Sequence, residues 1–126
     1  MWVSAVRAGD LKGIFKNAAL AMFDIMAEKN PQAATVKNIT IKQKAETIEE
    51  LFINWLNELL SLSSAKNLIF SGFKINKLDD FNLQAIAVGE DIKNYKVNAE
   101  IKAATYHQLK LEKTRVGWQA EVIFDV

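Results

Sequence analysis

The last two residues of the chain bring two carboxylates next to each other. The segment 120–126 alternates as a strand up to its final residue, so the side chain of Asp125 lies one residue from the α-carboxylate of Val126. Two hard oxygen anions this close suit a divalent cation such as calcium, provided that other oxygens complete about six to eight ligands. By spacing alone, a frayed terminus is the commoner outcome. The pair is therefore a candidate metal site that depends on its neighbours.

His107 is the only histidine of the chain, and it follows Thr105 and Tyr106 in a predicted strand. An imidazole in this position could act as a general base or as a metal ligand. The alternative is a half-exposed strand residue that is hydrogen-bonded to a neighbour. Because the chain has no cysteine and no second histidine to build a site around it, the structural role is favoured over the catalytic one.

Other polar and aromatic side chains are more simply explained by the surface and the core. Asp24 interrupts an apolar helical pattern, where a solvated helix flank is expected and a buried acidic ligand is the alternative. Glu100 and Lys102 share one side of a predicted strand, which favours a solvated face over a site. Tyr106 is expected to be an aromatic residue of the core or its rim, and so are Trp55 and Trp118.

Composition excludes several classes of function. The chain of 126 residues has no cysteine, which removes disulfides, thiolate zinc sites and cysteine nucleophiles and fits a cytoplasmic protein. It contains no glycine-rich phosphate loop, no HExxH and no Gly-x-Ser-x-Gly motif. Lys and Arg total 16 against 15 Asp and Glu, without an evident cluster, so any contact with RNA is expected through a protein partner. Neither a signal-peptide core nor a membrane-spanning run is present.

Two segments have the periodicity of amphipathic helices. Apolar residues recur every three or four positions from Leu11, with Asp10 as the N-cap, and Asn30-Pro31 is expected to end this helix. Thr47 followed by Glu50 is the signature of a capping box. The helix behind it is expected to end within the serine-rich stretch 61–67, since serine and asparagine favour turns.

The remaining segments alternate in the way that strands do. Strands are predicted over residues 2–8, 34–43, 67–78, 82–90, 99–113 and 117–126, and the last two form an antiparallel hairpin at Gly117. Strand and helix alternate first, and four strands follow. This order predicts an α+β fold, a single compact domain over residues 1–126 in which two amphipathic helices pack on a mostly antiparallel sheet.

The C-terminal motif resembles that of the archease family. The family pattern, roughly E-hydrophobic-K-A-x-T-Y-H, then a glycine turn, then hydrophobic-D-hydrophobic at the end, is matched by Glu100–His107, Gly117-Trp118 and Val122–Val126. The segment Leu11–Met26, with its N-A-A-x-x-M-F-D core, is similar to the family's first helix, and Leu51–Leu60 is similar to its second. The matches occur in the family's order and cover most of the chain.

This resemblance implies a partner protein, the RtcB-type RNA ligase, which joins tRNA exon halves and repairs RNA by a GTP-dependent route. Archease-like proteins help that ligase to become guanylylated and to turn over repeatedly, and do not join RNA themselves. Asp24, Glu100, Lys102, Thr105, Tyr106 and His107 are then candidates for partner contact or for support of the site. A monomer is favoured for the protein alone.

The resemblance also implies a divalent cation, typically calcium. Two of the family's ligands, the penultimate aspartate and the terminal carboxylate, correspond to Asp125 and Val126. A third, the aspartate of a His-Thr-Ala-Asp segment, would fall at Met1 by the family's spacing, with the rest of that segment upstream. Either the sequence begins at a late start or this copy has lost the segment. One charged ligand fewer is expected to weaken calcium binding.

Three hypotheses follow, in decreasing order of preference. The first is a metal-binding, non-catalytic activator of the RNA ligase. The second is a stand-alone metal-dependent hydrolase that would use Asp125, Glu100 and His107. The third is a scaffold domain without a site.

Overall fold

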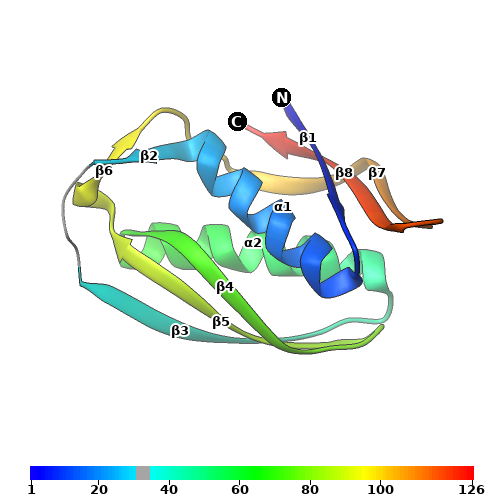
Figure 1. The fold of residues 1–126 in the computed structure, drawn as a ribbon. Helices are drawn as coiled ribbons and strands as arrows, with labels where there is room; N and C mark the ends of the chain where they lie inside the picture. The colour runs from blue at the N-terminus through cyan, green and yellow to red at the C-terminus, as the bar shows by residue number, and fades with distance from the viewer. Residues whose placement is uncertain (31–34) are drawn as a thin grey trace.

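The two helices lie between two small antiparallel sheets. The computed structural model describes residues 1–30 and 35–126. One sheet has the strand order β1-β8-β7 (Trp2–Ala8, Gly117–Asp125, Ala103–Thr114), and the other has the order β3-β5-β4 (Val36–Lys44, Asn82–Asp91, Leu68–Leu78). A two-stranded ribbon of β2 (Ala27–Lys29) and β6 (Tyr95–Val97) joins them at one end (Figure 1). Helix α1 (Leu11–Met26) contacts β1 and β8 of the first sheet and β4 of the second, while α2 (Ile48–Lys66) contacts β7, β3 and β4. The α+β prediction is confirmed, with two sheets where one was expected.

Helix α1 (Leu11–Met26) begins where the sequence predicts and ends earlier. Asp10 caps it, since its carboxylate Oδ1 accepts a hydrogen bond from the Gly13 amide at 2.8 Å. The helix ends at Met26, not at Asn30-Pro31, because the next residues form strand β2 (Ala27–Lys29), which pairs with β6 (Tyr95–Val97). Pro31 lies outside the described residues.

Helix α2 (Ile48–Lys66) has the predicted cap and ends within the predicted stretch. The Thr47 hydroxyl Oγ1 accepts a hydrogen bond from the Glu50 amide at 3.1 Å. Ser63 stays helical and buried, and it donates its hydroxyl to the Leu68 carbonyl oxygen at 2.5 Å. The prediction that the helix ends within residues 61–67 is confirmed, because its last residue is Lys66 and its C-cap, Asn67, is left-handed with φ 54°.

The strands follow the predicted alternation with two corrections. Strand β1 is confirmed. The predicted strand 34–43 corresponds to β3, which begins only at Val36, so Thr35 is not part of it, and Ala34 lies outside the described residues. The strand expected from residue 99 begins only at residue 103. The segment before it bonds elsewhere, because the amides of Asn98 and Ala99 both donate to the Met26 carbonyl oxygen. The strands are β1 Trp2–Ala8, β3 Val36–Lys44, β4 Leu68–Leu78, β5 Asn82–Asp91, β7 Ala103–Thr114 and β8 Gly117–Asp125, with a short 3₁₀ turn Ile92–Asn94 before β6.

The core forms around the helices. Trp55 of α2 is fully buried, and its indole N–H donates to the Phe15 carbonyl oxygen of α1 at 2.9 Å. Phe15 and Phe52 pack edge to face with ring centroids 5.1 Å apart. The buried faces of α1 and α2 pack against strands of both three-stranded sheets and so position these sheets around the core. Neither helix has the length and apolarity that a membrane crossing requires.

Candidate functional site

The C-terminal carboxylates lie at the end of a central strand. Asp125 is the last residue of β8, which pairs with β1 on one side and with β7 on the other. Trp2 is opposite Phe124, Ala103 is opposite Asp125, and the Lys102 amide donates to the Asp125 carbonyl oxygen at 2.8 Å. The expectation of a frayed terminus is therefore wrong for Asp125, because its neighbours hold its backbone. Its side chain is exposed.

The neighbours of Asp125 do not complete a cation site. Ala103 lies directly across from it on β7, and Met1 precedes Trp2 on the β1 side, so neither adjoining position offers a side-chain oxygen. Within residues 1–30 and 35–126, no three Asp, Glu, His or Cys side chains are grouped so that they could hold a metal ion. The Asp125 side chain and the α-carboxylate expected at Val126 would together supply two carboxylates to a cation that needs about six to eight oxygens. A cation held here would take most of its ligands from water or from another molecule.

Strand β7 carries a large bulge at the motif Thr105-Tyr106-His107. Thr105 pairs with Ile123 and Lys110 pairs with Glu121, so four residues of β7 are opposite Val122 alone. Gln108 within the bulge has φ 51°, an uncommon conformation for a residue other than glycine. The Thr105 hydroxyl donates to the Ile123 carbonyl oxygen at 3.2 Å and holds the start of the bulge to β8.

The bulge turns Tyr106 and His107 outward. Both side chains are exposed, Tyr106 by 55%. Partial burial, helped by the negative charge of Glu50, raises the pKa of the Tyr106 phenol, so Tyr106 is a neutral hydrogen-bond donor at physiological pH. The prediction that Tyr106 belongs to the core or its rim is wrong, because more than half of its surface is exposed and it does not pack against the core. An exposed tyrosine beside an exposed histidine suits contact with a partner surface.

The other candidate residues are exposed and separate. Asp24 lies on the solvated flank of α1, as expected. Glu100 and Lys102 are exposed, but they precede β7, so the prediction that they share one side of a strand is wrong. Glu100 instead borders a hollow with Met26 and Val97, near the ends of α1 and β6.

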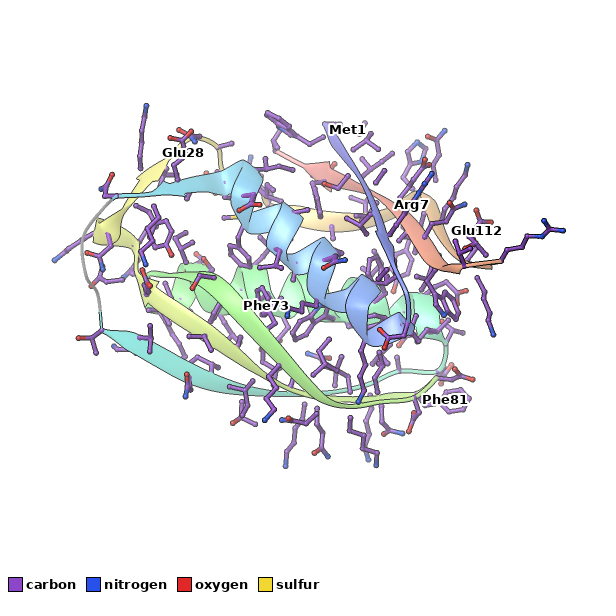
Figure 2. The ribbon with its side chains drawn as sticks, viewed as in Figure 1. Met1, Arg7, Glu28, Phe73, Phe81 and Glu112 are labelled. Carbon is purple, nitrogen blue, oxygen red and sulfur yellow. The ribbon has the colours of Figure 1, made fainter. Side chains whose placement is uncertain are left out.

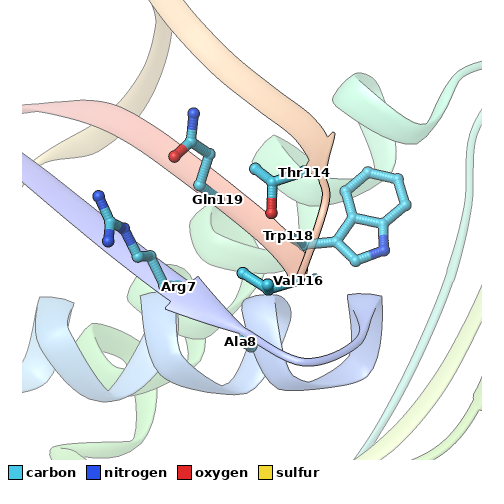
Figure 3. A pocket seen from close by; sticks show the side chains of 7 residues that line it. Arg7, Ala8, Thr114, Val116, Trp118 and Gln119 are labelled. Atoms are coloured by element: carbon cyan, nitrogen blue, oxygen red, sulfur yellow. The ribbon is translucent and has the colours of Figure 1, made fainter.

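A second hollow lies at the opposite end of β8 from Asp125. Arg7, Trp118 and Gln119 contribute to its lining, and Trp118 points away from the other two (Figure 3). At this point Gly117 has φ 150°, and a Cβ added there would be 2.3 Å from the Ala8 carbonyl oxygen. Asp125 lies eight residue steps along the strand from Gly117, about 26 Å at the usual rise. This hollow is therefore not part of the carboxylate site.

Two polar features were not predicted from the sequence. The Asn57 side chain of α2 makes two hydrogen bonds to the Ala104 backbone at the edge of β7. Lys29 Nζ lies 2.9 Å from Oε1 of Glu90, which is 4% exposed, and Tyr95 lies beside this pair. An asparagine within an apolar helix is the one sequence signal that could have indicated the first feature. The second arises from segments about sixty residues apart and leaves no local pattern.

Known proteins match this chain over nearly its whole length. The model of the Archease protein family (MTH1598/TM1083) matches residues 2–126. An archease from Methanosarcina barkeri is 36% identical over 120 residues, which cover 90% of this chain and 81% of that protein. An archease from Methanothermobacter thermautotrophicus is 34% identical, with coverage of 93% and 86%.

Solved structures match as well. The solution structure of Methanobacterium thermoautotrophicum protein 1598 has a TM-score of 0.67 and 28% identity, covering 98% of this chain and 89% of that one. A Thermotoga maritima crystal structure, described as an archease and possible chaperone, has a TM-score of 0.69 and covers 100% of this chain and 91% of that one. At 20% identity the Thermotoga structure supports the fold alone. The matches to the family and to its relatives agree with the motif at the end of the sequence, and the chain belongs to the archease protein family.

Proposed function

We propose that this protein is a non-catalytic activator of an RtcB-type, GTP-dependent RNA ligase in tRNA splicing and RNA repair. The observation that carries this proposal is the position of Asp125 at the end of the central strand β8, within the motif that gave the family resemblance. Its pairing with Ala103 and the hydrogen bond from the Lys102 amide fix the backbone of Asp125 on the β7 side, and a docking surface requires such a fixed position.

The activator would act by binding one state of the ligase better than another. A partner shifts a conformational equilibrium only through its differential affinity for the two states. Contact with the Asp125 end would favour the guanylylation-competent state, and the exposed Tyr106 and His107 would add contacts beside it. A divalent cation such as calcium would be bound weakly by Asp125, Val126 and water.

The stand-alone hydrolase has less support. Asp125, Glu100 and His107 do not form a metal-binding group among the residues that the structure describes. Metal-assisted hydrolysis needs a cation with fixed ligands and an activated water. Nothing in the geometry favours this second reaction over ligase activation.

The test is formation of the covalent ligase–guanylate adduct. The ligase of the same organism would be incubated with labelled GTP, with or without this protein, and the adduct and repeated RNA joining would be measured. We expect the wild-type protein to increase both and Asp125→Asn to increase them much less. Asp80→Asn is the matched control, because Asp80 is exposed on the β4–β5 turn of the other sheet. No increase with the wild-type protein would contradict the proposal.

A further inference from the structure

The outer face of the β3-β5-β4 sheet carries four lysines that are dispersed in the sequence. Lys42 is opposite Gln84 on one side, and Lys77 is opposite the same residue on the other. Lys74 is opposite Ile86, one step further along this face. Lys44 is opposite Asn82, so Lys42, Lys44, Lys74 and Lys77 stand on one side of three adjacent strands, and we call this set the lysine face.

The lysine face points away from the core. Ile41, between Lys42 and Thr40, is 2% exposed, and it is opposite the buried Ala85. Because successive strand residues point to opposite faces, the lysines lie on the solvent side, and all four are exposed. Side chains with nitrogen tips extend from this side of the sheet in the view of Figure 2.

The lysine face forms no salt bridge among the described residues, although Asp79 lies near enough to Lys77 for the lysine to help lower its pKa. The only acidic residue on the same side of these strands is Glu90, which is buried at the far end of β5 and bonded to Lys29. In the part of the chain that the structure describes, none of the four lysines is within salt-bridge distance of a carboxylate. The β4–β5 turn does carry Asp79 and Asp80. The Asp79 carboxylate accepts hydrogen bonds from the amides of Phe81 and Asn82.

An exposed aromatic ring stands at the end of the lysine face. Phe81 is 55% exposed in the β4–β5 turn, next to Asn82, and Figure 2 shows it at the end of this sheet. The Ala45 amide, one residue after Lys44, donates to the Phe81 carbonyl oxygen at 2.9 Å, which ties the turn to the end of β3. Lysines beside an exposed aromatic ring are the combination that binds single-stranded nucleic acid, with phosphates on the ammonium groups and a base stacked on the ring.

We propose that the lysine face and Phe81 form a binding surface for single-stranded nucleic acid. This goes beyond the proposed ligase activation, in which RNA is reached through the ligase. Lys42 of β3 and Lys77 of β4 flank Gln84 of β5 at two strand spacings, about 9.6 Å, so one backbone that crosses the sheet can place phosphates on both ammonium groups. Gln84 and Thr40 add side chains that donate hydrogen bonds to phosphate oxygens. An acidic protein surface would use the lysines but would have no need of Phe81.

The test measures binding of a short fluorescein-labelled single-stranded RNA by anisotropy at several salt concentrations. The wild-type protein should bind with a Kd on the order of 10⁻⁵ M, as non-specific binders do. Lys42→Gln/Lys77→Gln should make the negative slope of log K against log salt less steep by about 1.4, since each lost phosphate contact removes about 0.7. The matched control is Lys12→Gln/Lys16→Gln, which removes two exposed lysines of α1 and should leave the slope unchanged.

Substitutions at Phe81 distinguish binding of a nucleic acid from binding of an acidic protein. Phe81→Ala should weaken RNA binding by about fivefold to 150-fold, Phe81→Trp should restore it, and a duplex of the same sequence should bind more weakly. Equal binding by the two double-lysine variants, no effect of Phe81→Ala, or displacement of the RNA by polyglutamate as readily as by unlabelled RNA would each overturn the proposal. Circular dichroism melting of every variant establishes that it is folded.

Discussion

Asn57 and Ala104 are joined by two hydrogen bonds between a helix and a strand edge. Asn57 Nδ2 donates to the Ala104 carbonyl oxygen at 3.1 Å, and the Ala104 amide donates to Asn57 Oδ1 at 2.7 Å. A side-chain amide thus takes the place that a neighbouring strand would occupy. The contact covers the edge of β7 next to the C-terminal carboxylates and prevents another strand from pairing there.

We expect Asn57→Ala to destabilise the protein by about 1–3 kcal/mol, because it leaves the buried Ala104 backbone groups without partners. The free energy of unfolding in urea measures the effect. Asn54→Ala is the matched control, since Asn54 lies in the same helix and the structure gives its side chain no hydrogen bond. Equal stability of the two variants would contradict the role of Asn57.

Gly117 is required by the close approach of two backbones. Its φ of 150° and the 2.3 Å between an added Cβ and the Ala8 carbonyl oxygen predict that Gly117→Ala is destabilising. The expected loss is about 1–3 kcal/mol, as for a residue forced into a strained conformation, and thermal melting would detect it. Gly9→Ala provides the comparison, because an added Cβ at Gly9 meets nothing within 4 Å. A similar loss in both variants would disprove this explanation.

Because of the Lys29–Glu90 pair, we expect the free energy of unfolding to decrease at alkaline pH. The hydrogen bond to Glu90, opposed by partial burial, raises the pKa of Lys29 above 10.5. A raised pKa means that folding favours the charged lysine, so its contribution is present below pH 10.5 and is lost as the pH rises through the folded-state value. Burial also raises the pKa of Tyr95, whose ionisation destabilises the folded state in the same range.

The measurement therefore needs a Tyr95→Phe background. In that background, the difference in unfolding free energy between Lys29 and Lys29→Met should be constant up to pH 10 and then shrink. A difference that persists unchanged at higher pH would show that the aliphatic part of Lys29, and not its charge, provides the stability.

Because of Asp79, we expect the free energy of unfolding to decrease at acid pH. Hydrogen bonds from the Phe81 amide and from Asn82 hold the pKa of Asp79 below 3.8. A lowered pKa means that the contribution of Asp79 is present above pH 3.8 and is lost as the pH falls through the folded-state value. Asp79→Ala should thus reduce stability at neutral pH and have little effect at strongly acid pH, while Asp80→Ala, without these bonds, should change little at either pH. Urea denaturation at neutral and at strongly acid pH would measure the unfolding free energy of both variants and test this difference.

Calcium should bind weakly to this chain and more tightly to one with an added carboxylate. With two carboxylates, Asp125 and Val126, we expect a Kd of about 10⁻⁴ to 10⁻³ M, and Asp125→Asn should abolish binding. Met1→Asp, prepared by cleaving an N-terminal tag, would place a third carboxylate next to the end of β8 and should tighten it. Isothermal titration calorimetry would measure calcium binding to the wild-type protein, to Asp125→Asn and to Met1→Asp. Tight binding to the Asp125→Asn variant would show that the cation binds elsewhere.

The sequence predicted the helices and strands better than it predicted which strands pair with each other. The caps at Asp10 and Thr47 and the alternation of the strands are local signals, and the structure confirms them. The end of α1 depends on pairing between Ala27–Lys29 and Tyr95–Val97, about seventy residues away, and no local pattern indicates it.

The candidate site was predicted only in part, because some of its neighbours come from segments that are distant in the sequence. The adjacency of Asp125 and Val126 is covalent, so the sequence shows it directly. The order β1-β8-β7 decides what lies beside them, and short-range spacing does not reveal it. The lysine face was missed because Lys42 and Lys77 are far apart in the chain and the net charge is only +1.

The bulge in β7 sets the phase of the strand that follows it. In a regular strand, residues five positions apart face opposite ways, yet Thr105 and Lys110 pair with Ile123 and Glu121, which face the same way. The bulge thereby keeps Leu111 on the side of the core, opposite the buried Ala120. The bulge takes up the residues that a regular pairing would have to place, so the register beyond it is set by β8 and not by the number of residues between Thr105 and Lys110. Relatives that differ in length within this segment can therefore keep the same interior of the hairpin, whereas a one-residue shift in the regular pairing beyond it would expose the core side.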